Sequence, residues 1–535
     1  MGGFQGLAIS SFEAKKFPVN YSAPEGFNEI LETYSKLHTN FELIPSIIKN
    51  YVDSNISVTE HKLVNSVAYQ VKLCDIPGKF LPEKAIQIGV PKGPLFKDLV
   101  MGKNVTLPNG TIVTPDLVKA PPHIGETVFF VNCYSPSDIQ CLPTDCNTFD
   151  FVVHFTHPSL LFTPEYLSHF DPNQKSVCFS ETGHITFHSI SELYTASIQI
   201  SNRLWHPLIE YDVLQQIELP LGFHEGHPKL QYAFAPFDKR RFIEPTIENI
   251  EPHLEEPLPQ FNDFMVTFLG TGSTYPSKYR NVSGILIHTH SGYIVLDAGE
   301  GFAFQLQRKY GPNNLRHILS NILCIWISHI HGDHHFGLYQ LLQKRSLLCN
   351  TPVPLICHPL IERHMQTIQQ KVGSLNYIYY PHNETFKTGN TVIESIPVIH
   401  CIDSYGCVCT IDGGWRVAYS GDRASTDNFP KVVGCCDLLI HEATFTDDLI
   451  ENAIEKKHCT LGQAINAGVE ANARYVIMTH FSQRYPKVPV FNDENENIAF
   501  AFDYMSCKFE DIEELCKVCP EVMKLIQERE EKDEK

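Results

Sequence analysis

The sequence lacks the features that would place it in a membrane or a secretory pathway. No run approaches the roughly 18 apolar residues of a transmembrane helix. The opening residues, MGGFQGLAISSFEAKKF, have no basic stretch and no small-residue cleavage pattern, so they predict no secretory signal. They also lack the Ser or Thr at the sixth position that myristoylation requires.

Paired cysteines and an excess of basic charge are also missing. The 17 cysteines are odd in number and irregularly spaced, which favours a reducing compartment over a disulfide framework. One C-x-x-C pair, Cys516 and Cys519, has no second pair at zinc-ligand spacing, so we interpret it as two thiols on one helix face. The net charge of -19 argues against a protein that coats nucleic acid nonspecifically, although a local basic patch stays open.

The length and composition predict two folded units. A chain of 535 residues is too long for one ordinary core, and 43% hydrophobic with 19% charged residues indicates folding throughout. The Pro- and Glu-rich segment 242–261 reads as a linker. After it, strands are predicted in FMVTFLGTGS, GILIHTHSGYIVLDAGEG, CIWIS, TVIESIPV, RVAYSGD, CDLLIHEAT and YVIMTHF, alternating with helical stretches in an α/β pattern.

The first half carries a faint copy of the second. MGGFQGLAISSFE resembles HHFGLYQLLQKR, TVFFVNCYSPSD resembles WRVAYSGD, and FDFVVHFTHPSL resembles CDLLIHEATFTD. Each match is weak alone, but three in the same order favour an internal duplication.

Metal-ligand side chains crowd the end of one predicted strand. The run NILCIWI is followed by SHIHGDHHFGL, which contains His329, His331, Asp333 and His334 in an H-x-H-x-D-H pattern. A two-metal site needs two or three ligands per ion and usually a bridging carboxylate. Later strand ends offer the remaining candidates: His400, Asp422 and His480. A lone strand-end His is usually structural and SGD alone is a turn, but all seven together predict a metal centre.

At this point the sequence resembles the metallo-β-lactamase superfamily from residue 264 to about 510. The resemblance implies an αββα sandwich with a dinuclear site at one edge. It assigns His329, His331 and His400 to one zinc ion and Asp333, His334 and His480 to the other, with Asp422 bridging. Asp297 in IVLDAGEG matches an earlier family aspartate that orients a ligand.

Three further motifs resemble long-form ribonuclease Z, the tRNA 3′-processing endonuclease. The first is PSKYRN, whose Lys278, Arg280 and Asn281 would bind substrate phosphate, although this spacing alone would suit a solvated turn. The second is HEAT, whose Glu442 would pair with His458 in KKHCT as a proton donor to the leaving group. Cys459 replaces the family's serine after that histidine.

The third motif lies in the first half. Residues 88–118 resemble the flexible arm of the long forms, with its Gly-Pro at Gly93 and Pro94 and a hairpin expected at LPNGTIV. The arm would bind tRNA away from the catalytic site, whereas the plain alternative is a surface hairpin.

The resemblance then implies a domain plan. Residues 1–241 would form a degenerate metallo-β-lactamase half with the arm, 242–261 a linker, 262–510 the catalytic domain and 511–535 a charged helical tail. His154 and Phe155 would stand in place of His441 and Glu442, and Asp138 would correspond to Asp422. The opening strands of the first half are expected to be missing, which would leave an unpaired sheet edge.

The implied activity is zinc-dependent hydrolysis of precursor tRNA, with two Zn²⁺ ions, a 3′-hydroxyl left on the tRNA and a 5′-phosphate on the trailer. Asp333, Glu442 and His458 would be catalytic. The chain would act as a monomer with its halves packed as a pseudo-dimer, in the nucleus, the mitochondrion or the cytoplasm, without a membrane.

Three alternatives stay open: a thioester or lactone hydrolase of the same superfamily, a β-CASP nuclease, and a tRNA-binding protein without activity. The first needs neither PSKYRN nor the arm. The second would need a domain inserted after SGD, and the interval from Asp422 to His480 is too short for one. The third is disfavoured by the complete ligand set.

Overall fold

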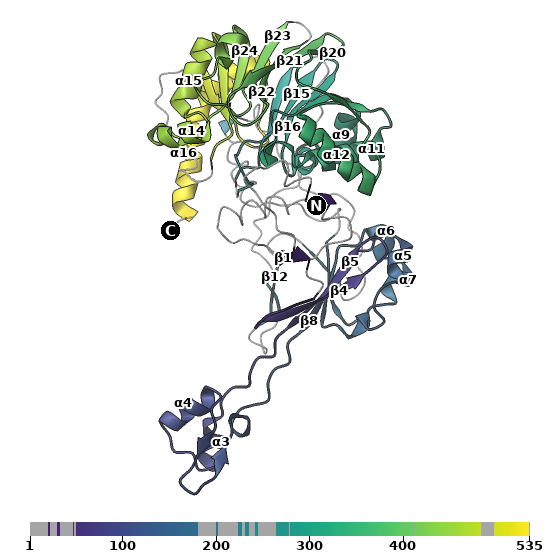
Figure 1. Cartoon of the computed structure of the whole chain (residues 1–535), viewed down its shortest axis with the longest axis vertical. Helices are drawn as coiled ribbons and strands as arrows, with labels where there is room; N and C mark the ends of the chain where they lie inside the picture. The colour runs from purple at the N-terminus through teal and green to yellow at the C-terminus, as the bar shows by residue number, and fades with distance from the viewer. Residues whose placement is uncertain are drawn as a thin grey trace.

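We describe a computed structural model of the chain. It describes residues 20–21, 29–30, 32, 46–47, 50–179, 200–201, 223–226, 230–234, 241–243, 264–277, 279–411, 414–482 and 497–533. Figure 1 shows the second half, in teal to yellow, as one layered unit, and the first half, in purple to blue, as a smaller one that carries a projecting arm. Among the described residues, no helix is long and apolar enough to cross a membrane.

The first sheet of the second half has seven strands in the order β19-β18-β17-β16-β15-β14-β27. They are β14 (Met265–Gly270), β15 (Gly284–Thr289), β16 (Gly292–Ala298), β17 (Ile322–Trp326), β18 (Val353–Ile356), β19 (Tyr377–Tyr380) and β27 (Ser506–Lys508). Strands β16 to β19 run parallel, so their carboxyl ends meet at one edge.

The second sheet also has seven strands, in the order β20-β21-β22-β23-β24-β25-β26. They are β20 (Phe386–Thr388), β21 (Thr391–Val398), β22 (Ser404–Ile411), β23 (Trp415–Tyr419), β24 (Cys436–Glu442), β25 (Ala473–Thr479) and β26 (Ile498–Phe500). Pairing is antiparallel from β20 to β23 and parallel from β23 to β26. All seven strand segments predicted from the sequence are strands here.

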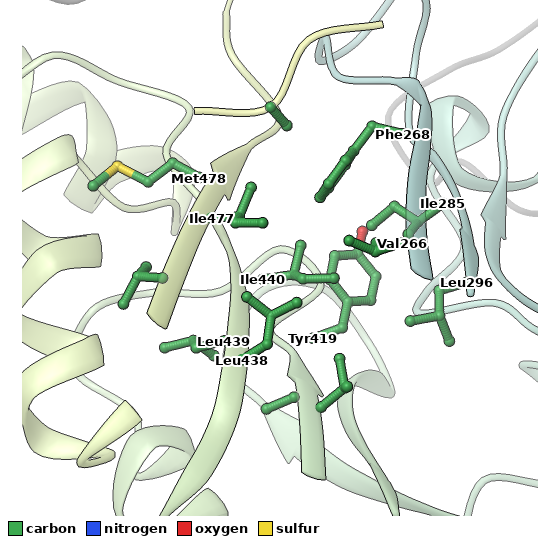
Figure 2. Close-up of a cluster of buried hydrophobic side chains, with 14 of the residues drawn as sticks. Val266, Phe268, Ile285, Leu296, Tyr419, Leu438, Leu439, Ile440, Ile477 and Met478 are labelled. Carbon is green, nitrogen blue, oxygen red and sulfur yellow. The ribbon is translucent and has the colours of Figure 1, made fainter. Parts of the chain in front are cut away.

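A continuous apolar core joins the two sheets. In Figure 2, Val266, Phe268 and Ile285 of one sheet face Tyr419 and Ile440 of the other. Each large side chain buried in this way contributes about 1.5–3 kcal/mol to stability. The strands β14, β15 and β16 are buried along their whole length, so they read as largely apolar runs in the sequence.

Helices cover the outer faces of the sandwich. On the first sheet lie α9 (Phe302–Ser320), α11 (Leu338–Leu348) and α12 (Pro359–Val372), which share an apolar cluster with β14 to β18. On the second lie α13 (Phe429–Val433), α15 (Leu461–Glu470) and α16 (Ile512–Asp533). The short helices α10 (Gly332–His335) and α14 (Ile450–Lys456) complete the unit. This is the predicted αββα sandwich (Figure 1).

The helix α16 departs from the predicted charged tail. Its first turns bury one apolar face in the core of the second half, through Ile512, Leu515, Cys516, Cys519, Val522 and Met523. The two cysteines of the C-x-x-C pair are therefore packed core thiols. Only the last turns of α16 carry the run of charged residues, so the packed unit extends well past residue 510.

The first half has its own sheet, in the order β11-β10-β9-β8-β5-β4-β3. The strands are β3 (Asn50–Val52), β4 (Ile56–Lys62), β5 (Val67–Leu73), β8 (Thr127–Val131), β9 (Phe151–His154), β10 (Lys175–Cys178) and β11 (Phe223–Glu225). Three short helices accompany it: α5 (Pro136–Ile139), α6 (Pro158–Leu161) and α7 (Pro164–Leu167). Smaller pairs are β1 (Asn20–Tyr21) with β2 (Ser46–Ile47) and β12 (Gln231–Ala233) with β13 (Arg241–Ile243).

This sheet repeats the plan of the second sheet of the other half. Its pairing is antiparallel from β3 to β8 and parallel from β8 to β11, as it is from β20 to β23 and from β23 to β26. The register also matches: Val128 pairs with Phe151 as Val417 pairs with Leu438, and Asp150 and Asp437 accept backbone hydrogen bonds from Thr127 and Arg416. The duplication inferred from the sequence therefore has a structural counterpart.

The shared register fixes which residues correspond at the strand ends. His154 takes the position of His441, and Phe155 takes that of Glu442, as the sequence alignment expected. His154 is fully buried, and burial lowers the pKa of its imidazole to about 3. This edge of the first half therefore has an aromatic ring where the second half has a carboxylate.

The expected correspondence of Asp138 with Asp422 is wrong. The register places Cys133 at the position of Asp422, while Asp138 lies further along, in α5. There its carboxylate accepts backbone hydrogen bonds from Asn65, Tyr134 and Ser135. Asp138 therefore stabilises the start of a helix, as acidic side chains at that position do.

The arm is an insertion between β5 and β8, from Cys74 to Glu126, and so exceeds the predicted 88–118. It contains α3 (Pro82–Gln87), α4 (Pro94–Val100), β6 (Val105–Thr106), β7 (Ile112–Val113) and the turn η1 (Pro115–Leu117). The pairing of β6 with β7 gives the predicted hairpin. A small core of its own holds the arm together: Ala85, Val90, Leu99, Val105, Leu107, Val113 and Val118. Figure 1 shows it standing away from the sheet on two extended segments.

Gly93 and Pro94 start α4 in the arm. Gly93 has a φ of 140°, a conformation that side chains with a Cβ rarely adopt, and Pro94 occupies the first helical position, which suits its fixed φ. Of the predicted linker 242–261, the structure describes only residues 242 and 243, which belong to β13.

Candidate metal centre

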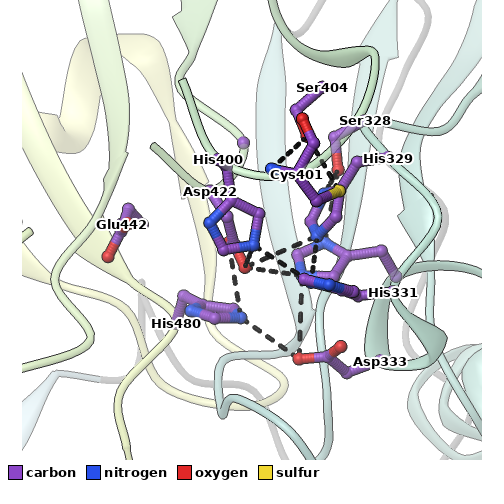
Figure 3. Close-up of polar contacts among 12 residues, drawn as sticks. Ser328, His329, His331, Asp333, His400, Cys401, Ser404, Asp422, Glu442 and His480 are labelled. Atoms are coloured by element: carbon purple, nitrogen blue, oxygen red, sulfur yellow. Dashed lines mark hydrogen bonds and ion pairs between the residues drawn. The ribbon is translucent and has the colours of Figure 1, made fainter. Parts of the chain in front are cut away.

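The candidate ligands lie at the carboxyl ends of four strands. His329 and His331 follow β17, and Asp333 and His334 belong to α10 directly after it. The other three, His400, Asp422 and His480, follow β21, β23 and β25. All seven reach one cluster at the edge of the sandwich (Figure 3).

Three histidine nitrogens converge in the first group. His329 Nε2 and His400 Nε2 each lie 3.0 Å from His331 Nδ1. The other ring nitrogen of His400 lies 2.9 Å from the carbonyl oxygen of Lys457, which accepts its proton, so His400 Nε2 carries a lone pair. A proton on His331 Nδ1 could satisfy only one of its two neighbours. A cation would satisfy all three.

The second group contains Asp333, His334 and His480. Asp333 Oδ2 lies 3.7 Å from His334 Nε2 and 3.3 Å from His480 Nε2. His334 Nε2 is buried, and no residue in the described part of the chain forms a hydrogen bond with it. Buried polar atoms are rarely left unpaired, so this atom also fits a metal ligand.

Asp422 stands between the two groups. Its Oδ2 lies 3.6 Å from His329 Nε2, 3.7 Å from His400 Nε2 and 3.3 Å from His334 Nε2. Its Oδ1 lies 3.4 Å from His480 Nε2 and has no hydrogen-bond partner. A carboxylate placed in this way can bridge two cations.

Burial keeps His329 and His400 neutral. It holds the pKa of His329 well below its usual range and lowers that of His400 to about 3. Burial opposes ionisation of Asp333 and Asp422, but the surrounding histidines outweigh it and lower the pKa of both carboxyl groups. Neutral imidazoles and ionised carboxylates are the forms that bind metal ions.

Asp297, at the end of β16, has the position of an orienting residue. Its Oδ2 lies 2.7 Å from His334 Nδ1, while Ser328 and Tyr419 donate hydrogen bonds to the same carboxylate. Asp297 has a φ of 59°, which is uncommon for a residue other than glycine and is often found at functional sites.

Glu442 and His458 lie beside the cluster. Glu442 Oε1 is 3.0 Å from His458 Nδ1 and also accepts backbone hydrogen bonds from Arg423 and Cys459. Burial disfavours the charged imidazole of His458, but the Glu442 carboxylate outweighs it and raises the pKa to about 8. The backbone of Cys459 makes the contact to Glu442, so this contact does not depend on the side chain that replaces the family's serine.

The segment that leads into the PSKYRN loop contacts the metal centre. The backbone N–H of Thr274 donates to Asp333 Oδ2 at 2.6 Å. Arg280 points inward: its guanidinium donates to Thr271 and to the carbonyl of Ala501 and stacks over Phe481 at 4.6 Å. The structure therefore gives Arg280 contacts within the protein, where the sequence predicted a phosphate contact.

Asn281, another predicted substrate residue of this loop, also makes contacts within the protein. The side-chain amide of Asn281 donates to the carbonyl of Glu300, and its backbone N–H donates to Asp503 Oδ2. Lys278 lies outside the described residues.

Sequence reasoning missed Asp503 and Thr444. Asp503 is buried and also accepts two hydrogen bonds from Thr271, so it anchors the loop. Thr444 connects Glu442 to His480. Asp503 carries no motif signal in AFDYM, whereas Thr444 belongs to the HEAT motif, whose last residue could have been singled out.

The fold and the candidate metal centre together indicate the class of this domain. Residues 293–481 match a family model described as a beta-lactamase superfamily domain. With the αββα sandwich and the cluster at its edge, this part of the chain is a metallo-β-lactamase-type domain.

Curated relatives narrow the resemblance. The chain is 29% identical to ribonuclease Z 1 of Schizosaccharomyces pombe over 83% of its length, and 30% identical to zinc phosphodiesterase ELAC protein 2 of Mus musculus over 86%. It spans 64% of the length of each of these relatives. It is also 34% identical to the Arabidopsis thaliana tRNase Z TRZ3, mitochondrial, over 51% of this chain and 38% of that protein. The predicted resemblance to ribonuclease Z is confirmed.

A solved structure extends the likeness to the whole fold. The crystal structure of a long form RNase Z from yeast matches with a TM-score of 0.73, covering 100% of this chain and 91% of that chain at 17% identity. At this identity the match concerns the fold alone, which agrees with the two-half plan in Figure 1.

Proposed function

We propose that the chain is a zinc-dependent endoribonuclease that removes the 3′ trailer from precursor tRNA. The observation that carries the proposal is the pairing of Glu442 with His458 directly beside the seven clustered ligand side chains. A hydrolase of thioesters or lactones has no need for an acid so placed, nor for an arm. The names of the relatives support the same activity.

The metal assignment is part of the proposal. His329, His331 and His400 would hold one zinc ion, Asp333, His334 and His480 a second, and Asp422 would bridge them. The unpaired His334 Nε2 and Asp422 Oδ1 support this fit. Two bound zinc ions would activate water near neutral pH and neutralise charge on the phosphoryl oxygens.

The chain's own residues would then position the reaction. Asp333, held by the backbone of Thr274, would orient the attacking water and accept its proton. His458, charged through Glu442, would donate a proton to the departing 3′-oxygen of the tRNA. The products would be a 3′-hydroxyl on the tRNA and a 5′-phosphate on the trailer.

Substrate would be bound at two places. The PSKYRN loop, through Lys278 and the backbone that Asp503 anchors, would lie against the phosphates near the cleavage site. The arm would bind the tRNA body at a distance, through Gly93 and Pro94 and through the lysines in and beside α3 and α4: Lys84, Lys92, Lys97 and Lys103. Binding should weaken steeply with salt, because phosphate contacts release counterions.

The proposed function also includes a domain organisation and a subcellular localisation. The first half would serve as a non-catalytic, arm-bearing half packed on the second within one monomer, as a pseudo-dimer. In support, Glu29 lies 2.5 Å from Lys371 of α12, Ile30 belongs to the apolar cluster of the second half, and Ser201 donates to Glu514 of α16. We propose that the protein acts in the nucleus, the mitochondrion or both, with the cytoplasm as the alternative; the mitochondrial tRNase Z among the relatives supports the mitochondrion.

A parallel assay of three substrate classes tests the proposal. The zinc-loaded protein should cleave a 3′-extended precursor tRNA, hydrolyse bis(p-nitrophenyl) phosphate slowly, and leave thioesters and lactones intact. Metal analysis should find about two zinc equivalents, as a two-metal site requires. Hydrolysis of a thioester or lactone with no phosphodiester cleavage would overturn the proposal, and so would cleavage that Asp333→Ala leaves unchanged.

A further inference from the structure

Thr444, directly after β24, touches both parts of the proposed active site. Its buried hydroxyl oxygen lies 2.6 Å from Glu442 Oε2, 2.8 Å from His480 Nδ1 and 3.2 Å from His458 Nδ1. The hydroxyl therefore stands between the pair proposed to move a proton and a side chain proposed to hold a metal ion.

Hydrogen-bond accounting fixes the direction of these contacts. A hydroxyl has one proton to donate, and an ionised carboxylate can only accept. The Thr444 proton must therefore go to Glu442 Oε2, its shortest contact. The hydroxyl oxygen can then only accept from His480, so the proton of that imidazole sits on Nδ1.

The tautomer of His480 follows. With the proton on Nδ1, the lone pair is on Nε2, which lies 3.3 Å from Asp333 Oδ2 and 3.4 Å from Asp422 Oδ1. That nitrogen faces the cluster in Figure 3. A hydrogen bond to the far nitrogen of a ligand histidine fixes its ring and raises its basicity.

The same arrangement occurs on the other side of the cluster. Ser328 donates to Asp297 Oδ2 at 2.9 Å, and its oxygen lies 2.9 Å from His329 Nδ1. A carboxylate, a hydroxyl and a ligand histidine thus stand in line twice, once as Asp297–Ser328–His329 and once as Glu442–Thr444–His480. The repetition argues that the hydroxyl of Thr444 has a role toward the ligand and does more than fill space.

We propose that Thr444 is a positioning residue that fixes the metal-binding tautomer of His480 and connects it to Glu442. Glu442 then serves two histidines: it charges His458 through Oε1 and, through the Thr444 hydroxyl, supports His480 through Oε2. The inference rests on the proposed function only in that it takes His480 as a ligand.

Metal affinity, measured without RNA, tests this inference. Thr444→Val keeps the shape and removes the hydroxyl, so affinity for the zinc ion that His480 would hold should fall about 10- to 100-fold in competition with a chelator. Thr444→Ser keeps the hydroxyl and should remain near the wild type. The matched control is Thr391→Val, because the buried hydroxyl of Thr391 has no hydrogen-bond partner among the described residues, and zinc affinity of this variant should not change.

A second comparison separates the coupling from a general defect. Glu442→Ala should also weaken zinc, and the double variant with Thr444→Val should be little worse than either alone, because the two residues act in one chain. If Thr444→Val does not fold, Thr444→Ala and Thr444→Ser give the same comparison. Unchanged zinc affinity in Thr444→Val, or equal loss in Thr444→Ser, would overturn the inference. Failure to cleave precursor tRNA would overturn only the proposed function.

Discussion

At the scale of single residues, the account depends on the charge of one imidazole. His458 is held at 3.0 Å by the Glu442 carboxylate, and its pKa is raised to about 8. It is therefore mostly protonated near neutral pH, which is the form that a donor to a leaving oxygen requires.

Removing either member of this pair should slow the chemical step. Positioned proton transfer typically contributes about 10²- to 10⁴-fold, so Glu442→Ala and His458→Ala should each lower kcat by that factor under saturating zinc. A substrate with sulfur in the 3′-bridging position leaves without a proton and should restore much of the rate. No better cleavage of the sulfur substrate would contradict the assignment.

The dependence of kcat on pH should reflect the titration of His458. The protonated form of His458 persists below its pKa, so kcat should be insensitive to this group below about pH 8 and should fall as pH rises through that value. In Glu442→Gln the charge that raises the pKa is lost, and the alkaline limb should move to lower pH. An unmoved limb, measured under single-turnover conditions at saturating zinc, would assign it to another group.

Local motifs made the metal ligands predictable from the sequence. The directions in which other side chains point, such as that of Arg280, could not be predicted. His400, Asp422 and His480 lie together because β21, β23 and β25 run in the same direction and end at one edge of the second sheet. The H-x-H-x-D-H run follows β17 and meets them from the first sheet. The inward turn of Arg280 depends on Phe481 and Ala501, which are far along the chain, so no local pattern could reveal it. The accepting role of Thr444 likewise depends on contacts across strands.

At the scale of elements, the arm behaves as an insertion with its own core. Ile76 and His123 exchange two backbone hydrogen bonds of 2.9 Å at its base, so the chain can be closed there. The Asn-Gly turn predicts the hairpin, but the predicted bounds of the arm are too narrow because its extended base has no periodic pattern.

Replacing residues 77–122 by an Asn-Gly turn should leave the sheet of the first half intact. We expect KM for precursor tRNA to rise at least tenfold, while hydrolysis of bis(p-nitrophenyl) phosphate is unchanged, since the arm lies outside the metal cluster. Steady-state kinetics on both substrates measures this. Equal losses on the two would make the arm a structural element.

The helix α16 should be part of the stability of the second half. Leu515→Ala removes a fully buried side chain and should cost about 2–5 kcal/mol of unfolding free energy. The matched control on the exposed face, Glu521→Ala, should stay within about 0.5 kcal/mol. Urea unfolding followed by circular dichroism measures both variants. An unchanged free energy of unfolding in Leu515→Ala would favour the solvated tail that the sequence predicts.

At the scale of the whole molecule, one sheet plan is used twice with different strand ends. In the second half these strand ends carry Asp422, His441 and Glu442, whereas the corresponding positions of the first half hold Cys133, His154 and Phe155. Weak sequence repeats were enough to predict this duplication. The sequence also matched His154 and Phe155 correctly, but the equivalence of Cys133 with Asp422 needed the strand register, which one sequence does not contain.

The most direct test of the whole account is to map the ends produced from a 3′-extended precursor tRNA by the zinc-loaded chain. We predict cleavage at the start of the trailer, with a 3′-hydroxyl on the tRNA and a 5′-phosphate on the trailer, abolished by Asp333→Ala and by a chelator. An intact precursor in the presence of fully zinc-loaded protein, or a 2′,3′-cyclic phosphate on the tRNA, would contradict the account.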